Sequence, residues 1–156
     1  VTGGAEIARQ VEPRTASNTP QSIADPIEYD VRALNAGVSN TFNRLRLTGR
    51  VDVRQYDYDD GRSLSGAVVE QDDRDQTTYE GLARVDYAIS PATALYGRVI
   101  WNDRRYDASG SALTPNRDSN GVNAIVGANF ELSNLVRGEV GVGYLQQTFD
   151  NPLYGE

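Results

Sequence analysis

The sequence contains no cysteine, histidine, methionine or lysine, and these absences narrow the chemistry open to its 156 residues. Without cysteine or histidine, the chain cannot form a disulfide, a thiol nucleophile, a Ser-His-Asp triad or a zinc site of the usual kind. All 15 basic residues are arginine and 22 residues are acidic, so the net charge of −7 argues against nucleic acid as a partner. No apolar run reaches about 18 residues, so we expect no membrane-spanning helix.

The sequence alternates with a period of two, which is typical of β-strands whose two faces meet different surroundings. The clearest case is Leu45 to Arg54, where the odd positions are Leu, Leu, Gly, Val and Val, and the even positions are Arg, Thr, Arg, Asp and Arg. The pattern recurs in the ranges 79–89, 95–102, 122–132 and 136–145, and more weakly in about 3–12 and 27–38. It therefore predicts seven strands.

The weak range 27–38 has an apolar face of Tyr29, Val31 and Ala33 and a polar face of Glu28, Asp30 and Arg32. Between the predicted strands, short links near 39–43, 90–93 and 133–134 alternate with long polar loops near 13–26, 59–76 and 107–119. This alternation places the tight turns on one rim and the long loops on the other. We therefore expect an all-β, antiparallel up-and-down arrangement over residues 1–156.

Three features favour a transmembrane β-barrel over a soluble β domain. The predicted strands are about 10–14 residues long, whereas soluble strands have about 5–6 residues and tilted membrane strands need about 9–11. The apolar face is rich in Gly, Ala and Val, which fill a two-sheet core badly but suit contact with acyl chains. Aromatic residues also lie at the two ends of the apolar face, where membrane interfaces favour them: Tyr79, Trp101 and Tyr144 toward the long loops, and Tyr87 and Phe130 toward the short turns.

The polar face carries charges of both signs, which suits a water-filled interior crossed by arginine–carboxylate pairs. The candidate lumen-lining residues are Arg46, Arg50, Asp52, Arg54, Glu80, Arg84, Asp86, Arg98, Arg137 and Glu139. We expect a channel that passes polar solutes without catalysis, a cofactor or a bound metal, and whose partner is the lipid bilayer.

Other functions compete with this hypothesis. A two-acid hydrolase is disfavoured because Glu80 and Asp86 are six residues apart on one strand, or roughly 20 Å. The acidic segments 57–61 and 71–75 offer oxygen ligands for calcium but lack the spacing of a calcium loop. A soluble or surface-exposed β domain that binds carbohydrate or a protein partner stays open, as does a structural scaffold of an envelope assembly.

Two segments carry a resemblance to a known family. The segments Asp86 to Val99 and Gly127 to Pro152 resemble the strand–turn–strand units of outer-membrane β-barrels. More specifically, they are similar to the Putative β-barrel porin 2 family of Gram-negative bacteria, often found near exopolysaccharide genes. The resemblance implies a location in the bacterial outer membrane and a pore or secretion-channel role, with polysaccharide or envelope proteins as possible partners.

The strand number suggests that the sequence is part of something larger. Bacterial single-chain barrels have an even number of strands, and seven are predicted here. The sequence also begins with Val, without a secretory leader, and ends without the C-terminal aromatic residue expected of such barrels. We therefore expect a fragment of a barrel.

Overall fold

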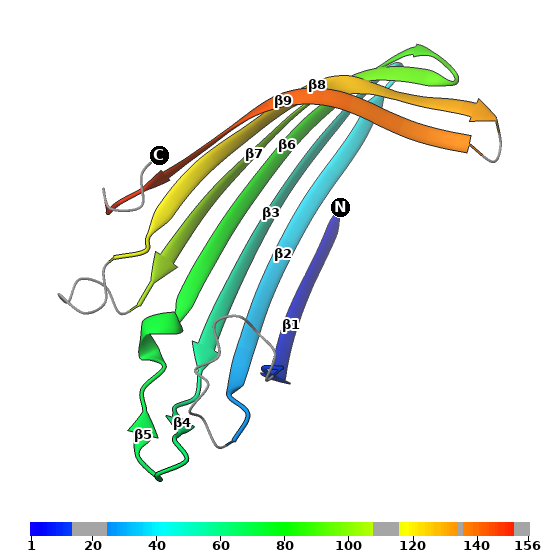
Figure 1. Ribbon diagram of the computed structural model, residues 1–156. Helices are drawn as coiled ribbons and strands as arrows, with labels where there is room; N and C mark the ends of the chain where they lie inside the picture. The colour runs from blue at the N-terminus through cyan, green and yellow to red at the C-terminus, as the bar shows by residue number, and fades with distance from the viewer. Residues whose placement is uncertain (14–24, 108–115, 134–135, 152–156) are drawn as a thin grey trace.

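One antiparallel sheet of seven long strands dominates the computed structural model, which describes residues 1–13, 25–107, 116–133 and 136–151 (Figure 1). In sheet order the strands are β1 (Thr2–Val11), β2 (Glu28–Phe42), β3 (Leu45–Tyr58), β6 (Gln76–Ser90), β7 (Thr93–Tyr106), β8 (Ser119–Ser133) and β9 (Val136–Phe149). Sheet order follows chain order, so the predicted all-β, up-and-down fold with seven strands is confirmed.

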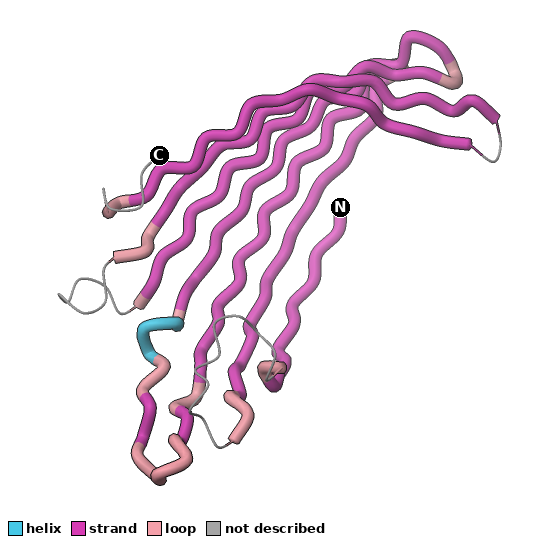
Figure 2. Tube along the Cα trace, in the orientation of Figure 1, coloured by secondary structure: helices cyan, strands magenta, loops and turns pink. Residues whose placement is uncertain are grey.

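The long connection between β3 and β6 has structure of its own. It contains the two-residue strands β4 (Gly61–Arg62) and β5 (Val68–Val69), which pair with each other, and the 3₁₀ helix η1 (Asp72–Arg74). Figure 2 shows this hairpin extending beyond the ends of the long strands. No helix among the described residues is long and apolar enough to cross a membrane.

The strands are longer than the alternation indicated. Six of them have 14 or 15 residues, and β1 has 10. The expected link at 39–43 is wrong, because β2 continues to Phe42 and only Asn43 and Arg44 separate it from β3. Asn43 takes a left-handed backbone conformation with φ of 54°, which asparagine adopts more readily than most residues.

The register assigns every residue to one of two faces, because residues directly opposite each other in an antiparallel pair point the same way. Val51 lies opposite Ala36 on β2 and Gly81 on β6. We call the face that carries Val51 the apolar face, and the face that carries its neighbour Asp52 the polar face. The odd residues 45–53, 79–87 and 95–101 and the even residues 34–38, 122–130 and 138–144 all lie on the apolar face.

The expected faces of β2 are wrong. Leu34 pairs with Val53 on the apolar face, so Tyr29, Val31 and Ala33 lie on the polar face, with Ala33 opposite Arg54. The strand contains two short apolar alternations of opposite phase, which meet at Ala33 and Leu34. Only the second alternation, from Leu34 onward, belongs to the apolar face, and neighbouring β3 sets that phase.

The apolar face has no covering layer. Val142, Val126 and Leu34 expose 73%, 62% and 61% of their surface, and among the described residues only Ile27, Val31 and Tyr96 are buried hydrophobic residues. In a soluble sandwich the apolar faces of two sheets pack together at close to crystal density. This sheet instead turns a continuous apolar surface outward, and no second sheet of comparable size packs on it in the described part of the chain.

The sheet curls most sharply toward β8 and β9, which arch over the other strands in Figure 1. Tyr96 on β7 lies opposite Gly127 on β8, which lies opposite Gly141 on β9. A Cβ atom at Gly127 would overlap the carbonyl oxygen of Val140 and lie 2.8 Å from the Tyr96 ring. Tyr96 is only 6% exposed because its ring occupies the space that the two glycines leave open. Because Gly127 and Gly141 have no side chain, the sheet can curl sharply at these two positions.

We predict that Gly127→Ala destabilises the folded protein by at least about 2 kcal/mol, because the added methyl group has no space. The matched control is Gly49→Ala, where the nearest atom to a new Cβ, on Val38, is 3.8 Å away. The measurement is the folded fraction after refolding into detergent, read from heat-modifiable gel mobility. Equal folded fractions for the two variants would contradict the role assigned to Gly127.

Candidate functional site

The polar face is the candidate site, and it holds every residue that the sequence nominated for a lumen. Arg46, Arg50, Asp52 and Arg54 on β3 share this face with Glu80, Arg84 and Asp86 on β6, Arg98 on β7, and Arg137 and Glu139 on β9. The five nominated aromatic residues, Tyr79, Tyr87, Trp101, Phe130 and Tyr144, all lie on the opposite, apolar face. The structure thus separates the two nominated sets completely.

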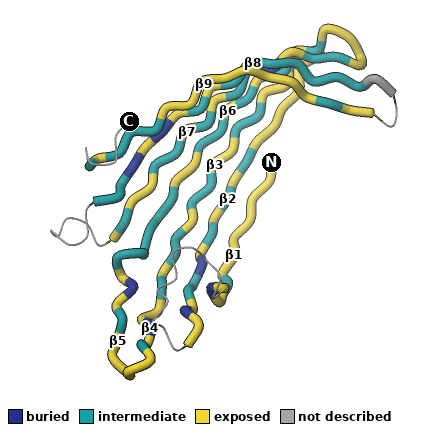
Figure 3. The backbone as a smooth tube through the Cα atoms, viewed as in Figure 1, coloured by how far each residue is buried: buried dark blue, intermediate teal, exposed yellow. Residues whose placement is uncertain are grey.

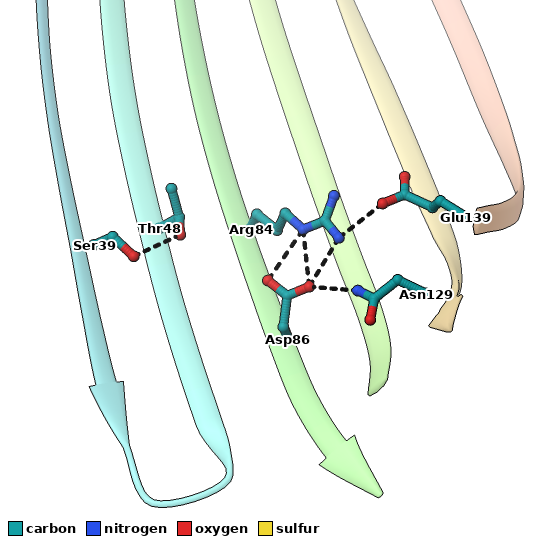
Figure 4. Close-up of polar contacts among 6 residues, drawn as sticks. All are labelled: Ser39, Thr48, Arg84, Asp86, Asn129 and Glu139. Atoms are coloured by element: carbon teal, nitrogen blue, oxygen red, sulfur yellow. Dashed lines mark hydrogen bonds and ion pairs between the residues drawn. The ribbon is translucent and has the colours of Figure 1, made fainter. Parts of the chain in front are cut away.

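A network centred on Arg84 crosses four strands of the polar face (Figure 4). The Arg84 guanidinium donates hydrogen bonds of 2.8–3.0 Å to the Asp86 carboxylate and one of 3.0 Å to Glu139 Oε2. Asn129 on β8 donates to Asp86 Oδ1 at 3.1 Å. Glu139 lies three strands away from Arg84, or about 14 Å along a flat sheet. The contact is possible because the polar face is concave here.

The Arg84 side chain is held by packing as well as by charge. Its guanidinium carbon lies 4.2 Å from the centre of the Tyr96 ring, the same ring that covers Gly127 and Gly141. A guanidinium over an aromatic face gains electrostatic attraction, more so when it is partly shielded from water. The Arg84 side chain is 20% exposed. Curvature and charge pairing therefore depend on one another at this position.

Two further ion pairs lie on the polar face, one within strand β3 and one across the hairpin formed by β8 and β9. Arg50 donates two hydrogen bonds of 2.6 Å to Asp52, two residues along β3 and hence on the same face. Arg137 on β9 donates to Glu131 on β8 at 3.0 Å. Each pair offsets two opposite charges while leaving the polar face strongly polar.

Three of the nominated arginines, Arg46, Arg54 and Arg98, have no ion pair with another described residue. Arg46 lies directly opposite Asp86, whose carboxylate is already bound by Arg84. Nε of Arg98 is shielded from solvent and has no hydrogen-bond partner in the described structure. Among the nominated arginines, these three guanidinium groups are the ones with no carboxylate within ion-pair distance in the described structure.

A hollow of about 630 Å³ lies on the polar face near the short turns. Arg46, Arg84 and Arg137 line it together with Asp86 and Asn129. A smaller hollow of about 250 Å³ lies nearer the long loops and includes Arg50, Asp52 and Glu80. Both hollows offer charged groups to whatever fills them, and the larger one adds the Asn129 amide, which suits water and polar solutes.

The contacts of the carboxylates disfavour a catalytic pair of the kind that glycosidases use. Asp52 and Glu80 are directly opposite each other on β3 and β6, so their spacing alone would allow a two-acid site. Both oxygens of Asp52, however, accept hydrogen bonds from Arg50, which favours a structural role as the partner of an arginine. Among the described residues, no group of three or more carboxylates gathers as a metal site requires.

Sequence reasoning missed several residues of the polar face. Tyr56, Tyr58, Arg104 and Tyr106 lie there because β3 and β7 continue past the ranges where the alternation is clear. The same phase, extended by four residues, would have placed them correctly. Four aliphatic residues also lie on this face: Leu82, Ile100, Ile125 and Leu145. Ile125 lies against Gly143 of β9, so this aliphatic side chain fills space in the curved part of the sheet.

We predict that Arg84→Gln lowers the free energy of unfolding by about 1–2 kcal/mol, since it removes hydrogen bonds to two carboxylates in a partly shielded position. Arg46→Gln is the matched control, because Arg46 faces the same Asp86 without an ion pair to it, and it should change stability little. The measurement is the urea midpoint of unfolding from lipid vesicles. A midpoint for Arg84→Gln equal to that of the control would exclude the cross-sheet contact as a stabilising one.

Comparison with known proteins agrees with this geometry. The sequence model of the family described as "Putative beta-barrel porin 2" matches residues 1–156. No curated protein and no solved structure matches the chain. All seven strands lie within the matched range, and the chain belongs to the Putative beta-barrel porin 2 family.

Proposed function

We propose that this chain forms part of the wall of a water-filled, passive channel for polar solutes in the outer membrane of a Gram-negative bacterium. The observation that carries the proposal is that the nominated charged residues and the nominated aromatic residues lie on opposite faces of the sheet. One face is apolar and uncovered, and the other is a concave surface of arginine, carboxylate and amide groups. Membership of a β-barrel porin family supports an outer-membrane location and a non-enzymatic role.

The dimensions of the apolar face support a membrane position. Tyr79 and Tyr87 are eight residues apart on β6, or about 26 Å along the strand. A strand tilt of 35–45° reduces this to about 20 Å of height, which is close to the apolar band of about 25 Å on outer-membrane barrels. Exposed aromatic residues at both limits of the band, such as Trp101 at one end and Phe42 at the other, suit the two interfaces.

Exposure to water would be costly for the same surface. Monomeric soluble proteins rarely expose an apolar patch of more than a few hundred Å². Here the exposed apolar side chains run across all the strands from β2 to β9. A soluble domain with this surface would need a partner over the whole of it, whereas a bilayer supplies the cover directly.

Transport would follow from the polar face without any chemical step. Polar solutes would exchange their hydration for contacts with fixed guanidinium, carboxylate and amide groups, and the balance of these charges would set ion preference. Among the nominated arginines, Arg46, Arg54 and Arg98 would contribute most per residue, because no described carboxylate is bonded to them. Association with polysaccharide export or with envelope proteins stays a prediction from the family resemblance.

We predict that the combined change Arg46→Glu, Arg54→Glu and Arg98→Glu shifts the intact protein toward cations, raising the K⁺/Cl⁻ permeability ratio by at least about threefold. The measurement is the reversal potential in a planar bilayer under a KCl gradient. Arg44→Glu is the matched control, since Arg44 lies in the short turn between β2 and β3 and outside the wall. A ratio that the triple change leaves unaltered would remove these residues from the conduction path.

A further inference from the structure

Four of the buried side chains gather at the long-loop rim on the β1 and β2 side of the sheet. Glu12, Ile27, Val31 and Gln71 are 7%, 2%, 7% and 3% exposed. Figure 3 shows this buried group at the long-loop ends of β1 and β2 and beside β5, apart from the buried positions on β7 and β8. Away from the curl at Tyr96, a sheet with no second layer buries residues where another segment folds onto it.

The segment 71–75, which includes Gln71 and η1, lies on the polar side of the sheet. Val31 is on the polar face by register, and Glu12 and Ile27 follow the same phase at the ends of β1 and β2. The Tyr58 ring at the end of β3 also lies on this face and stacks on Tyr29, with 4.9 Å between ring centres. Residues that contact these groups therefore lie inside the proposed lumen.

Arg74 of η1 makes the first attachment. Its guanidinium donates hydrogen bonds of 2.5 and 3.1 Å to the Glu12 carboxylate and one of 3.0 Å to Gln71 Oε1, and it lies 4.1 Å from the centre of the Tyr58 ring. The Arg74 and Glu12 side chains are 10% and 7% exposed. A shielded, two-pronged pair of this kind is much stronger than an exposed ion pair.

Arg117 makes the second attachment, just before β8. Its guanidinium donates to the Asp73 carbonyl oxygen and, at 3.1 Å, to the Asp73 carboxylate. It also lies 4.6 Å from the centre of the Tyr106 ring at the end of β7. Arg117 therefore repeats the Arg74 arrangement one hairpin further along the sheet.

The residue after each arginine completes the repeat. Asp75 and Asp118 each accept a hydrogen bond of 2.7 Å on the side chain, from the backbone N–H groups of Tyr58 and Tyr106. Burial raises the pKa of the Asp75 carboxyl, and nearby Asp57 and Asp72 add to the effect. The dipeptide Arg-Asp thus fastens the end of the preceding strand twice.

Together the attachments join distant parts of the rim. Glu12 belongs to the end of β1 and Arg117 to the start of β8, five strand spacings or about 24 Å apart along the wall. Both bind η1, through Arg74 and Asp73. Because the side chains of Arg74 and Arg117 bridge from one short segment to both of these points, the segment lies within the curve of the rim.

We propose that the segment 71–75 is a ledge fastened across the inner rim at the long-loop end, and that this ledge sets the size limit for solutes passing through the channel. The proposal rests on the channel function proposed above. Solutes would pass beside the ledge, and the Glu12–Arg74 and Asp73–Arg117 contacts would keep it in place.

The test uses the intact protein in liposomes, with Glu12→Gln and Arg117→Gln as release variants that each remove one attachment. Glu70→Gln is the matched control, because Glu70 is an exposed acid in the same loop. Release should increase trypsin cleavage after Arg74, relative to cleavage after exposed Arg62, by about tenfold. Liposome swelling should then extend to larger neutral sugars, while the control changes neither result.

Two outcomes overturn the ledge. Cleavage after Arg74 that stays at the wild-type level in both folded release variants means that these contacts do not hold the segment. Increased cleavage with an unchanged sugar size limit means that the segment does not restrict passage. Should one release variant fail to assemble, the other removes the opposite attachment and gives the same comparison. Failure of the wild-type protein to pass any sugar or ion contradicts the proposed channel itself, which separates that failure from failure of the ledge.

Discussion

The rest of the structure depends on one constraint. The backbone of each strand must pair with its neighbouring strands, while the two faces of the sheet meet unlike surroundings. In hydrocarbon, every backbone N–H and C=O group must be satisfied within the protein, and an antiparallel ladder does this between neighbouring strands. Once the ladder is fixed, alternate side chains must point to opposite faces. Residues such as Val51 and Asp52, adjacent in sequence, then serve opposite surroundings. Length, turn placement and face composition all follow from this constraint.

Curvature is the second requirement, and the structure meets it by combining small residues with long-range contacts. Gly127 and Gly141 let β8 and β9 approach the Tyr96 ring, and Arg84 then reaches Glu139 across the concave face. The rim uses other means, with arginines stacked on tyrosines and bound to acids of distant segments. The same residue type therefore stabilises the wall in its middle and at its long-loop end.

The sequence predicted the wall well because its signal is local. Around Leu45–Arg54 the alternation is regular, and both neighbouring strands keep the same phase. It failed where two phases meet, as at Ala33 and Leu34, because only pairing with β3 decides between them. Contacts between residues 55 or 62 positions apart, such as Arg84 with Glu139 or Arg74 with Glu12, depend on sheet curvature and loop folding. The repeated Arg-Asp dipeptide before β6 and β8 was a visible signal whose meaning only the structure supplies.

The central claim is that one face of the sheet meets lipid and the other meets water, and β3 offers the most direct measurement. The chain has no cysteine, so single cysteines at positions 47–54 can each carry a spin label in the membrane-embedded protein. The account predicts that odd positions collide mainly with lipid-dissolved oxygen, and even positions mainly with a water-soluble nickel complex, alternating along the whole strand. Uniform accessibility, or aqueous collisions at the odd positions, would contradict it.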